Sequence, residues 1–170
     1  MRAAALIMLS LAAQAQAAGP VLGGDAQACA SGAGPAVLAT ISGLKDRKGE
    51  VRLELYPANE QDFLKDDRDL VREGKLFRRV SVPAPPAGPL ALCLRVPRPG
   101  RYAVLLTHDR DGKNKFNIWS DGAGTPSNAK MGRGKPKLRD AIVDVAAGVR
   151  PVMIKAQYLR GFSGFSPMSD

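Results

Sequence analysis

The sequence contains only one histidine and two cysteines among its 170 residues. Because structural zinc sites use four Cys or His ligands, this small set argues against a zinc site. The sequence also lacks a Gly-x-Ser-x-Gly segment, the turn that carries the nucleophile of α/β-hydrolases. A hydrolase built on this chain would therefore have to rely on its single histidine, His108.

Long apolar runs are missing after residue 18. At the N-terminus, Arg2 precedes an apolar stretch, and Ala15 and Ala17 supply the small residues that a signal peptidase reads. The stretch is too short to cross about 30 Å of hydrocarbon. We therefore predict that residues 1–18 are a secretory signal peptide, and that the mature chain is periplasmic or secreted and has no membrane span.

The two cysteines, Cys29 and Cys93, are predicted to form a disulfide. An even number of cysteines in an exported protein favours pairing, because the compartment is oxidising. The bond would tie residues 19–35, an Ala- and Gly-rich segment expected to be a flexible arm, to a strand. The alternative is a buried Cys93 and a free thiol in the arm.

Acidic residues are outnumbered, since 25 Lys and Arg stand against 16 Asp and Glu and give a formal net charge of +9. The charge becomes 9 − 1 = +8 when Arg2 leaves with the signal peptide. This excess favours an anionic partner, such as an envelope component or an acidic protein. A Gly- and Pro-interrupted loop forms the predicted anionic-surface patch, with solvated surface as the alternative: Lys130, Arg133, Lys135, Lys137 and Arg139. We expect no nucleic-acid partner, because no aromatic residues are interleaved with these cations.

Long amphipathic helices are also missing, and short alternating segments bounded by Gly and Pro take their place. In the clearest of them, Val51, Leu53 and Leu55 alternate with polar residues, as in a strand with one buried face. Seven strands are expected, at residues 37–42, 50–56, 76–82, 90–96, 101–107, 142–145 and 152–158. This spacing is typical of an immunoglobulin-like antiparallel β-sandwich. We therefore expect an all-β domain at residues 36–160, with a long loop between the fifth and sixth strands and a frayed tail at residues 161–170.

Three segments of this domain, in order, resemble the bacterial domain-of-unknown-function family 2141. They are ISGLKDRKGEVRLELY, PRPGRYAVLLTHDRDGKNK, and GAGTPSNAKMG followed by LRDAIVDV. The resemblance covers about residues 36–158 and implies an exported β-sandwich with no established activity. The chain departs from the family pattern at Arg110, Lys113 and Lys115, in a loop that is usually rich in Asn and Asp, and at Asn117, where Asp is common.

The loop after the fifth predicted strand carries hard oxygen ligands of the kind that calcium prefers, on Asp109, Asp111, Asn114 and Asn117. The spacing does not match an EF-hand, because Gly112 comes too early and no Glu closes the loop. Asp and Asn also build turns through Asx hydrogen bonds without a metal. A calcium-stabilised structural domain and an Asx-built turn are therefore alternatives, and we expect no other cofactor.

His108 stands where the fifth predicted strand ends. A histidine titrates near neutral pH and can act as a general base. Adjacent residues on a strand point to opposite faces, however, so His108 and Asp109 are not expected to pair as a catalytic dyad. We therefore expect no enzymatic activity. A hydrolase that uses His108 is the third-ranked function, after a binding module and a calcium-stabilised structural domain.

Two of the few aromatic residues, Trp119 and Phe116, lie in the same long loop. Loops held on a rigid scaffold often carry binding residues. The alternative is that Trp119 covers the end of the sandwich, because one Trp buries a large apolar area. The predicted function is a non-catalytic binding module with four ligand-binding residues: Trp119, His108, Phe116 and Asn128.

Overall fold

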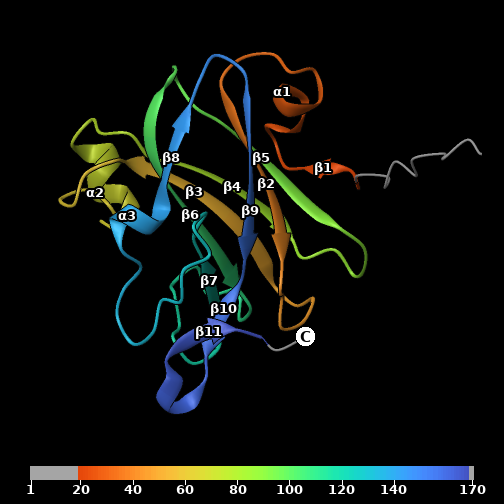
Figure 1. Cartoon of the computed structure of the whole chain (residues 1–170), viewed down its shortest axis with the longest axis vertical. Coiled ribbons are helices and arrows are strands. Elements are labelled where there is room, and N and C mark those ends of the chain that lie inside the picture. The colour runs from red at the N-terminus through yellow and green to blue at the C-terminus, as the bar shows by residue number, and fades with distance from the viewer. Residues whose placement is uncertain (1–18, 169–170) are drawn as a thin grey trace, which may run out of the picture.

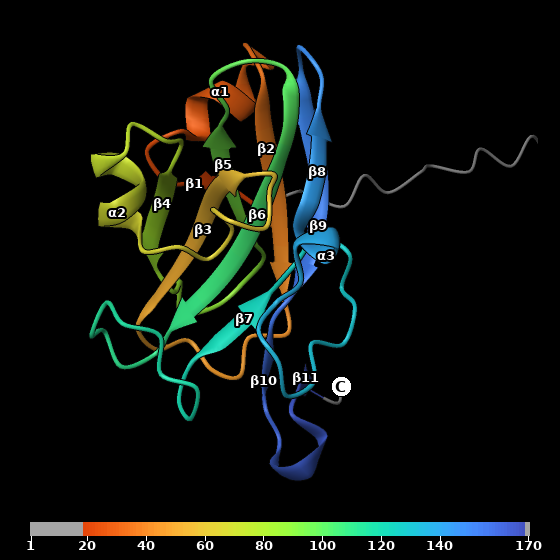
Figure 2. The same cartoon turned by 90° about the vertical axis from the view of Figure 1, so that its left-hand side faces the viewer.

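The computed structural model describes residues 19–168, so the signal peptide predicted at residues 1–18 lies outside the described residues. The chain forms two β-sheets that face each other and enclose one main core (Figures 1 and 2). The all-β class and the sandwich arrangement expected from the sequence are therefore confirmed. Within residues 19–168, no helix is both long and apolar enough to cross a membrane.

The first sheet has the strand order β1 (Val21–Leu22), β5 (Leu90–Arg95), β2 (Ala36–Ser42) and β9 (Val149–Lys155). The path through the second sheet is β11 (Phe165–Pro167), β10 (Gln157–Leu159), β7 (Gly122–Gly124), β6 (Gly100–Asp109), β3 (Glu50–Pro57) and β4 (Arg78–Pro83). A further strand, β8 (Ile142–Val145), pairs with the beginning of β6. The helices within residues 19–168 are short: α1 (Ala26–Ala30), α2 (Asp67–Arg72), α3 (Leu138–Ala141) and the 3-10 turn η1 (Gly161–Ser163).

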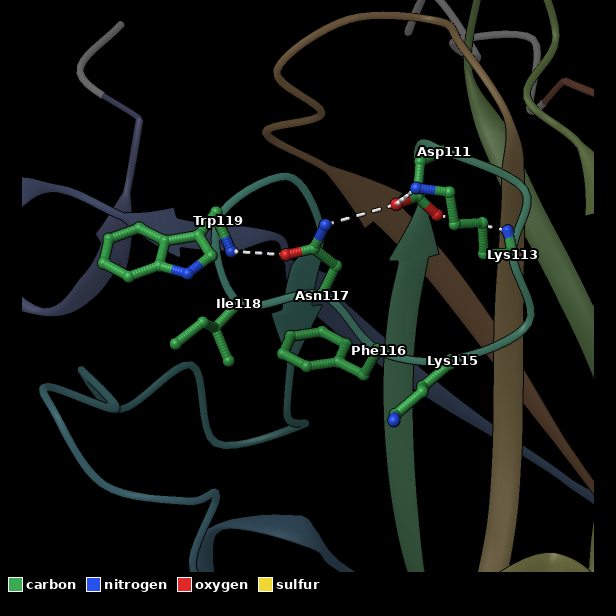
Figure 3. Close-up of a pocket in the computed structure, with 7 residues that line it drawn as sticks. All are labelled: Asp111, Lys113, Lys115, Phe116, Asn117, Ile118 and Trp119. Carbon is green, nitrogen blue, oxygen red and sulfur yellow. Dashed lines mark hydrogen bonds and ion pairs between the residues drawn. The ribbon is translucent and has the colours of Figure 1, made fainter.

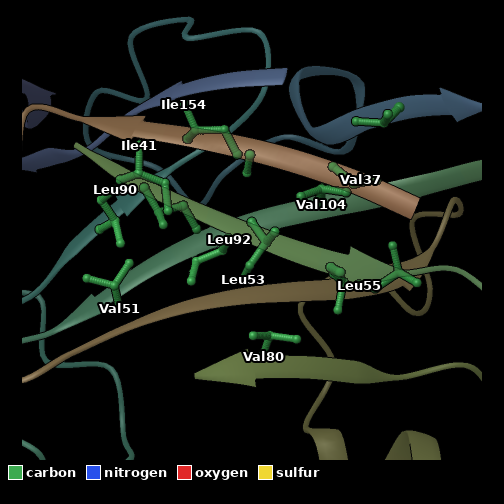
Figure 4. Packing of buried hydrophobic residues seen from close by; sticks show 14 of the residues in the cluster. Val37, Ile41, Val51, Leu53, Leu55, Val80, Leu90, Leu92, Val104 and Ile154 are labelled. Atoms are coloured by element: carbon green, nitrogen blue, oxygen red, sulfur yellow. The ribbon is translucent and has the colours of Figure 1, made fainter. Parts of the chain in front are cut away.

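The main core lies between the two sheets. Val51, Leu53 and Leu55 alternate along β3 and face inward, and Leu90 and Leu92 of β5 lie across from them (Figure 4). All five side chains are buried, as the alternation in the sequence predicts. This apolar layer is the main source of the stability that holds the two sheets together.

The outer face of β3 is buried as well, although the sequence predicts that it faces solvent. Arg52, Glu54 and Tyr56 are all less than a tenth exposed. Leu70 of α2 and Phe63 pack with Tyr56 in a second apolar cluster on this face of the sheet, and Figure 2 shows α2 beside β3 and β4. The second sheet is therefore covered on both faces where β3 crosses it, and the polar side chains there must be paired.

The strand count and the pairing differ from the prediction in detail. The predicted strand at residues 152–158 is divided between β9 in one sheet and β10 in the other. Two pairs, β1–β5 and β2–β9, are parallel, so the sandwich is not purely antiparallel. The predicted long loop between the fifth and sixth strands contains β7 and α3.

Both ends of the described chain are more regular than expected. The predicted flexible arm at residues 19–35 contains β1 and α1, and the predicted disulfide Cys29–Cys93 attaches it to β5. The predicted frayed tail at residues 161–170 contains η1 and β11, and β11 pairs with β10. Figures 1 and 2 place α1 at one end of the sandwich and the β10–β11 hairpin at the other.

Candidate binding end of the sandwich

The loop that follows β6 lies at the end of the sandwich opposite α1 (Figure 2). β6 pairs with β3 from Tyr102 to Asp109, and its other edge is shared by β8 at the beginning and β7 at the end. The chain leaves β6 at Asp109 and returns to the sheet in β7 at Gly122. The intervening residues 110–121 are therefore held at both ends by one sheet.

His108 is fully buried at the base of this loop, and both of its ring nitrogens are hydrogen-bonded. The carbonyl of Lys48 can only accept, so Nε2 donates to it at 2.7 Å. Nδ1 then accepts from the hydroxyl of Tyr158 at 2.6 Å, and that oxygen accepts from the backbone N–H of Lys45 at 3.0 Å. His108 thus joins β6, β10 and the turn before β3, and its ring has no free nitrogen for a ligand.

Burial fixes the protonation of this pair. It lowers the pKa of His108 below the ordinary 6.5, and it raises the pKa of Tyr158 to about 12. The imidazole is therefore neutral and the phenol protonated at neutral pH, which agrees with the donor and acceptor roles above. Neither group has the arrangement of a general base that faces a substrate.

Asp109 points to the opposite face of β6, as the alternation along a strand predicts, and it forms a buried ion pair. Its Oδ2 lies 2.5 Å from Nη2 of Arg52, and both side chains are almost fully buried. Its two oxygens also accept the backbone N–H groups of Gly112 at 2.8 Å and Asn114 at 3.1 Å. Arg52 donates in addition to the side-chain oxygen of Asn114 at 2.6 Å and to Glu50 at 2.9 Å.

A second buried carboxylate, Asp121, closes the loop from its other end, and sequence reasoning missed it. Its oxygens accept the backbone N–H groups of Arg110 at 3.0 Å and Asn117 at 2.8 Å, and the hydroxyl of Ser120 at 2.9 Å. The signal available in the sequence was an Asp directly before the Gly-Ala-Gly of β7, a position where a carboxylate can bind loop N–H groups.

Arg110 fastens the loop to the turn before β3. Its guanidinium donates to both carboxylate oxygens of Asp46 and, at 2.7 Å, to the carbonyl of Ser120. The hydrogen bonds from Arg110 to Asp46 are the main reason why the pKa of Asp46 is lowered to about 2. The base of the loop is therefore rigidly attached to β6, β3 and the turn between β2 and β3.

The residues predicted as calcium ligands are brought together only in part. Asp109 and Asp111 lie with Asp121, and these three residues offer carboxylate oxygens within 4.8 Å of one another. The oxygens of Asp111 accept from the Lys113 N–H and the Asn117 amide, and Asn117 in turn accepts the Trp119 N–H at 3.1 Å. All four predicted side chains thus already have hydrogen-bond partners, three of them within the loop and Asn114 through Arg52, and Arg52 also places a positive charge beside Asp109.

The tip of the loop differs from its buried base, because the apolar side chains at the tip face solvent. Trp119 is 79 % exposed, Ile118 48 % and Phe116 42 %. Figure 3 shows these three side chains around an open pocket of about 480 Å³, together with Asp111, Lys113, Lys115 and Asn117. Trp119 therefore does not plug the end of the sandwich, and Trp119 and Phe116 are the two predicted ligand-binding residues that lie together at the surface.

Asn128, the fourth predicted ligand-binding residue, has a structural place instead. Its side chain donates to the carbonyl of Met153 at 2.8 Å and accepts the N–H of Lys155 at 2.6 Å. Its backbone is left-handed, with φ 56°, a conformation that Asn tolerates better than most residues. Asn128 thus ties the segment after β7 to β9.

The predicted anionic-surface patch runs along the segment between β7 and α3 and ends at Arg139 within α3, and all five of its cations are exposed. Gly132 pairs with Phe165 of β11 through two backbone hydrogen bonds, of 2.5 and 3.0 Å. Gly164 fits closely here, since a Cβ on it would lie 2.2 Å from the Gly132 carbonyl carbon. Arg133 donates to the carbonyl of Phe162 at 2.9 Å, so the basic segment is attached to the β10–β11 hairpin.

Comparison with known proteins identifies a family but adds no activity. No curated protein and no solved structure matches the chain. The profile of one bacterial family, described as "uncharacterized protein conserved in bacteria", matches residues 39–152, which run from within β2 into β9 and include the whole loop described above. The chain therefore belongs to the DUF2141 family, as the sequence motifs predict.

Proposed function

We propose that this protein is a non-catalytic binding module that acts outside the cytoplasm. The observation that carries the proposal is the contrast within residues 108–121: a buried, fully hydrogen-bonded base supports a tip on which Trp119, Ile118 and Phe116 face solvent. A tip of this kind binds at low entropic cost, because its backbone is already ordered before the partner arrives. Exposed aromatic residues on such loops are typical binding anchors.

The extracytoplasmic location rests on the leader-like residues 1–18 and on the Cys29–Cys93 bond, which an oxidising compartment maintains. The test is expression of the full chain in a bacterium, followed by fractionation and N-terminal sequencing. We expect a periplasmic or secreted product that begins near residue 19. A cytoplasmic product that keeps Met1 would contradict the location.

The binding role is tested with the fluorescence of Trp119, which is the only tryptophan in the chain. Three probes are titrated into the mature protein: anionic lipid vesicles, heparin as a polyanionic glycan, and an acidic poly-glutamate. We expect saturable binding of at least one probe, a change in Trp119 emission on binding, and weaker binding of Trp119→Ala at unchanged Tm. The matched control is Val71→Ala, on α2, which also removes an exposed apolar side chain. If no probe alters Trp119 emission, or if Trp119→Ala binds as well as the wild type, the proposed surface is wrong.

A second candidate, a calcium-stabilised structural domain, is favoured by one observation, the grouping of the Asp109, Asp111 and Asp121 carboxylates. Calcium bound only by the native state would raise the Tm by mass action, and a chelator would reverse the rise. Asp111→Asn is the better test variant, because it removes a ligand charge and leaves the Arg52–Asp109 pair intact. A Tm that is equal in calcium and in chelator would remove this candidate.

A further inference from the structure

We infer that the binding end docks on the surface of an anionic lipid bilayer, with Trp119, Ile118 and Phe162 entering the boundary between headgroups and acyl chains. The inference rests on the proposed function, since it names the partner of the same surface. It depends on three properties of that surface. Three chain segments form one continuous surface, both aromatic and aliphatic side chains are exposed on it, and several of its lysines have no acidic partner.

Continuity follows from contacts between three chain segments. The ring of Phe116, in the loop after β6, lies 6.0 Å from the ring of Phe165 in β11. The backbone of Phe165 pairs with Gly132 in the basic segment. Arg133, the next residue, donates to the Phe162 carbonyl and holds its guanidinium 5.9 Å from the Phe162 ring. The loop after β6, the basic segment and the β10–β11 hairpin therefore form one surface.

The apolar side chains on this surface are of the types that enter a membrane interface. Phe162 is 93 % exposed, and it stands at the turn between β10 and β11 with no apolar cover in the described structure. Trp is enriched at the headgroup level of membranes, and Phe and aliphatic residues occupy the acyl side of interfacial segments. Ile118 favours lipid over a glycan, because sugar rings stack on aromatic faces and gain little from an exposed aliphatic chain. Exposed apolar side chains gathered at one end of a domain mark an interaction site.

The charge on this surface complements an anionic bilayer. Lys115, Lys130, Lys135 and Lys137 are exposed, and within residues 19–168 none of them lies within 4.0 Å of a carboxylate oxygen. The nearby acidic groups have other cationic partners: Asp109 pairs with Arg52, Asp111 with Lys113 and Asp140 with Arg139. The four lysines therefore add positive charge to this surface. Basic residues beside an interfacial apolar group attract the negative surface potential of anionic lipid.

The experiment uses the oxidised mature protein and vesicles of phosphatidylglycerol and phosphatidylcholine in equal parts, with pure phosphatidylcholine vesicles for comparison. Binding is measured by co-sedimentation, and insertion by the blue shift of Trp119 emission. We expect binding to the anionic vesicles, a blue shift on binding, and weaker binding as salt rises, because salt screens the surface potential.

Two variants separate the charge from the apolar contribution. Lys130→Gln/Lys135→Gln/Lys137→Gln is expected to weaken binding by about tenfold to 100-fold. Its matched control is Arg95→Gln/Arg98→Gln/Arg150→Gln, which removes the same charge at the opposite end of the sandwich and is expected to bind nearly as well as the wild type. Phe162→Ala is expected to reduce the blue shift of Trp119 and the affinity, whereas Val71→Ala changes neither.

Three results would overturn the lipid inference: no co-sedimentation with anionic vesicles, an unchanged Trp119 emission in the bound protein, or an equal loss in both triple variants. The heparin and poly-glutamate titrations distinguish this failure from failure of the proposed function. Binding of either polymer through Trp119 without vesicle binding would retain the binding module and remove the lipid partner. If none of the three probes engages Trp119, both proposals fail.

Discussion

The base and the tip of the loop after β6 are only about ten residues apart, but the base buries polar side chains and the tip exposes apolar ones. At the end of β6, His108 and Asp109 are buried, and the ring nitrogens and carboxylate oxygens are all hydrogen-bonded. At the tip of the following loop, Phe116, Ile118 and Trp119 face solvent. The polar side chains of the first region are already paired within the protein, and the second region exposes apolar side chains that a folded domain ordinarily buries. Polar residues at a loop base are thus the framework, and the apolar tip is the candidate site.

The largest effect should come from breaking the buried ion pair. Asp109→Ala leaves the Arg52 guanidinium buried without its main counter-charge, and we expect a loss of about 3–5 kcal/mol in the free energy of unfolding. Urea unfolding followed by circular dichroism measures the loss. The control is Asp111→Ala in the same loop, for which a much smaller loss is expected because that residue is not fully buried. Equal losses would mean that the buried Arg52–Asp109 pair stabilises the fold no more than the less buried carboxylate of Asp111 does.

The next effect should come from the His108 network. His108→Leu keeps the volume but leaves the Lys48 carbonyl without its donor and the O–H of Tyr158 without its acceptor, and we expect a loss of about 2–3 kcal/mol. Tyr158→Phe removes one hydroxyl and should cost less, about 1 kcal/mol. A neutral effect of His108→Leu would indicate that water replaces the ring, and it would free this residue for another role.

The protonation of His108 should also make the free energy of unfolding depend on pH. Burial lowers the pKa of His108 in the folded protein, so between that value and 6.5 the unfolded chain binds more protons than the folded one. Stability should therefore be fully present above 6.5 and fall as the pH drops below it. The loss from protonation of Asp46, whose pKa is about 2, belongs to a lower range, below the ordinary value of 3.8. Urea midpoints from about pH 7.5 to 5 measure the slope, and His108→Leu should flatten it.

The smallest effect on stability should come from the tip. Trp119→Ala removes an exposed side chain, and we expect a change of no more than about 0.5 kcal/mol. Before any partner is added, the emission of wild-type Trp119 should lie at the wavelength of solvent-exposed indole and be quenched readily by iodide. A large loss of stability, or an emission typical of a buried ring, would show that Trp119 supports the fold and would remove the contrast between the two regions.

The sequence predicts the core strands well because their alternation is local. Val51, Leu53 and Leu55 identify the inner face of β3 without any knowledge of the partner strands. The burial of Arg52 on the other face could not be predicted, because its cover comes from Asp109 and Asn114, far away in the chain. For the same reason Asp121 was missed, since its role depends on N–H groups that only the folded loop presents.

The division of residues 152–158 between two sheets is also invisible in the sequence. The alternation continues through Ala156, at which the chain passes from β9 to β10, and the Ala156 N–H bonds the Ser42 carbonyl at 2.9 Å. The order of the tail was not predicted, because it depends on the pairing of Phe165 with Gly132 and on the close approach of Gly164 to Gly132. Contacts of this kind leave no hydrophobic pattern in the sequence. At the candidate site, the position of Trp119 in a long loop was informative, whereas whether it faced solvent required the structure.

The attachment of the N-terminal arm has a consequence for association between molecules. β1 pairs with only two residues of β5, Ala91 and Leu92, and Asp25 accepts the N–H of Arg95 farther along the same strand. Between them, Cys93 is bonded to Cys29, so one covalent link holds the arm against this edge of β5. An uncovered strand edge is a template for pairing with another chain. We therefore expect reduction of the disulfide to release the arm and to cause self-association through the exposed edge of β5.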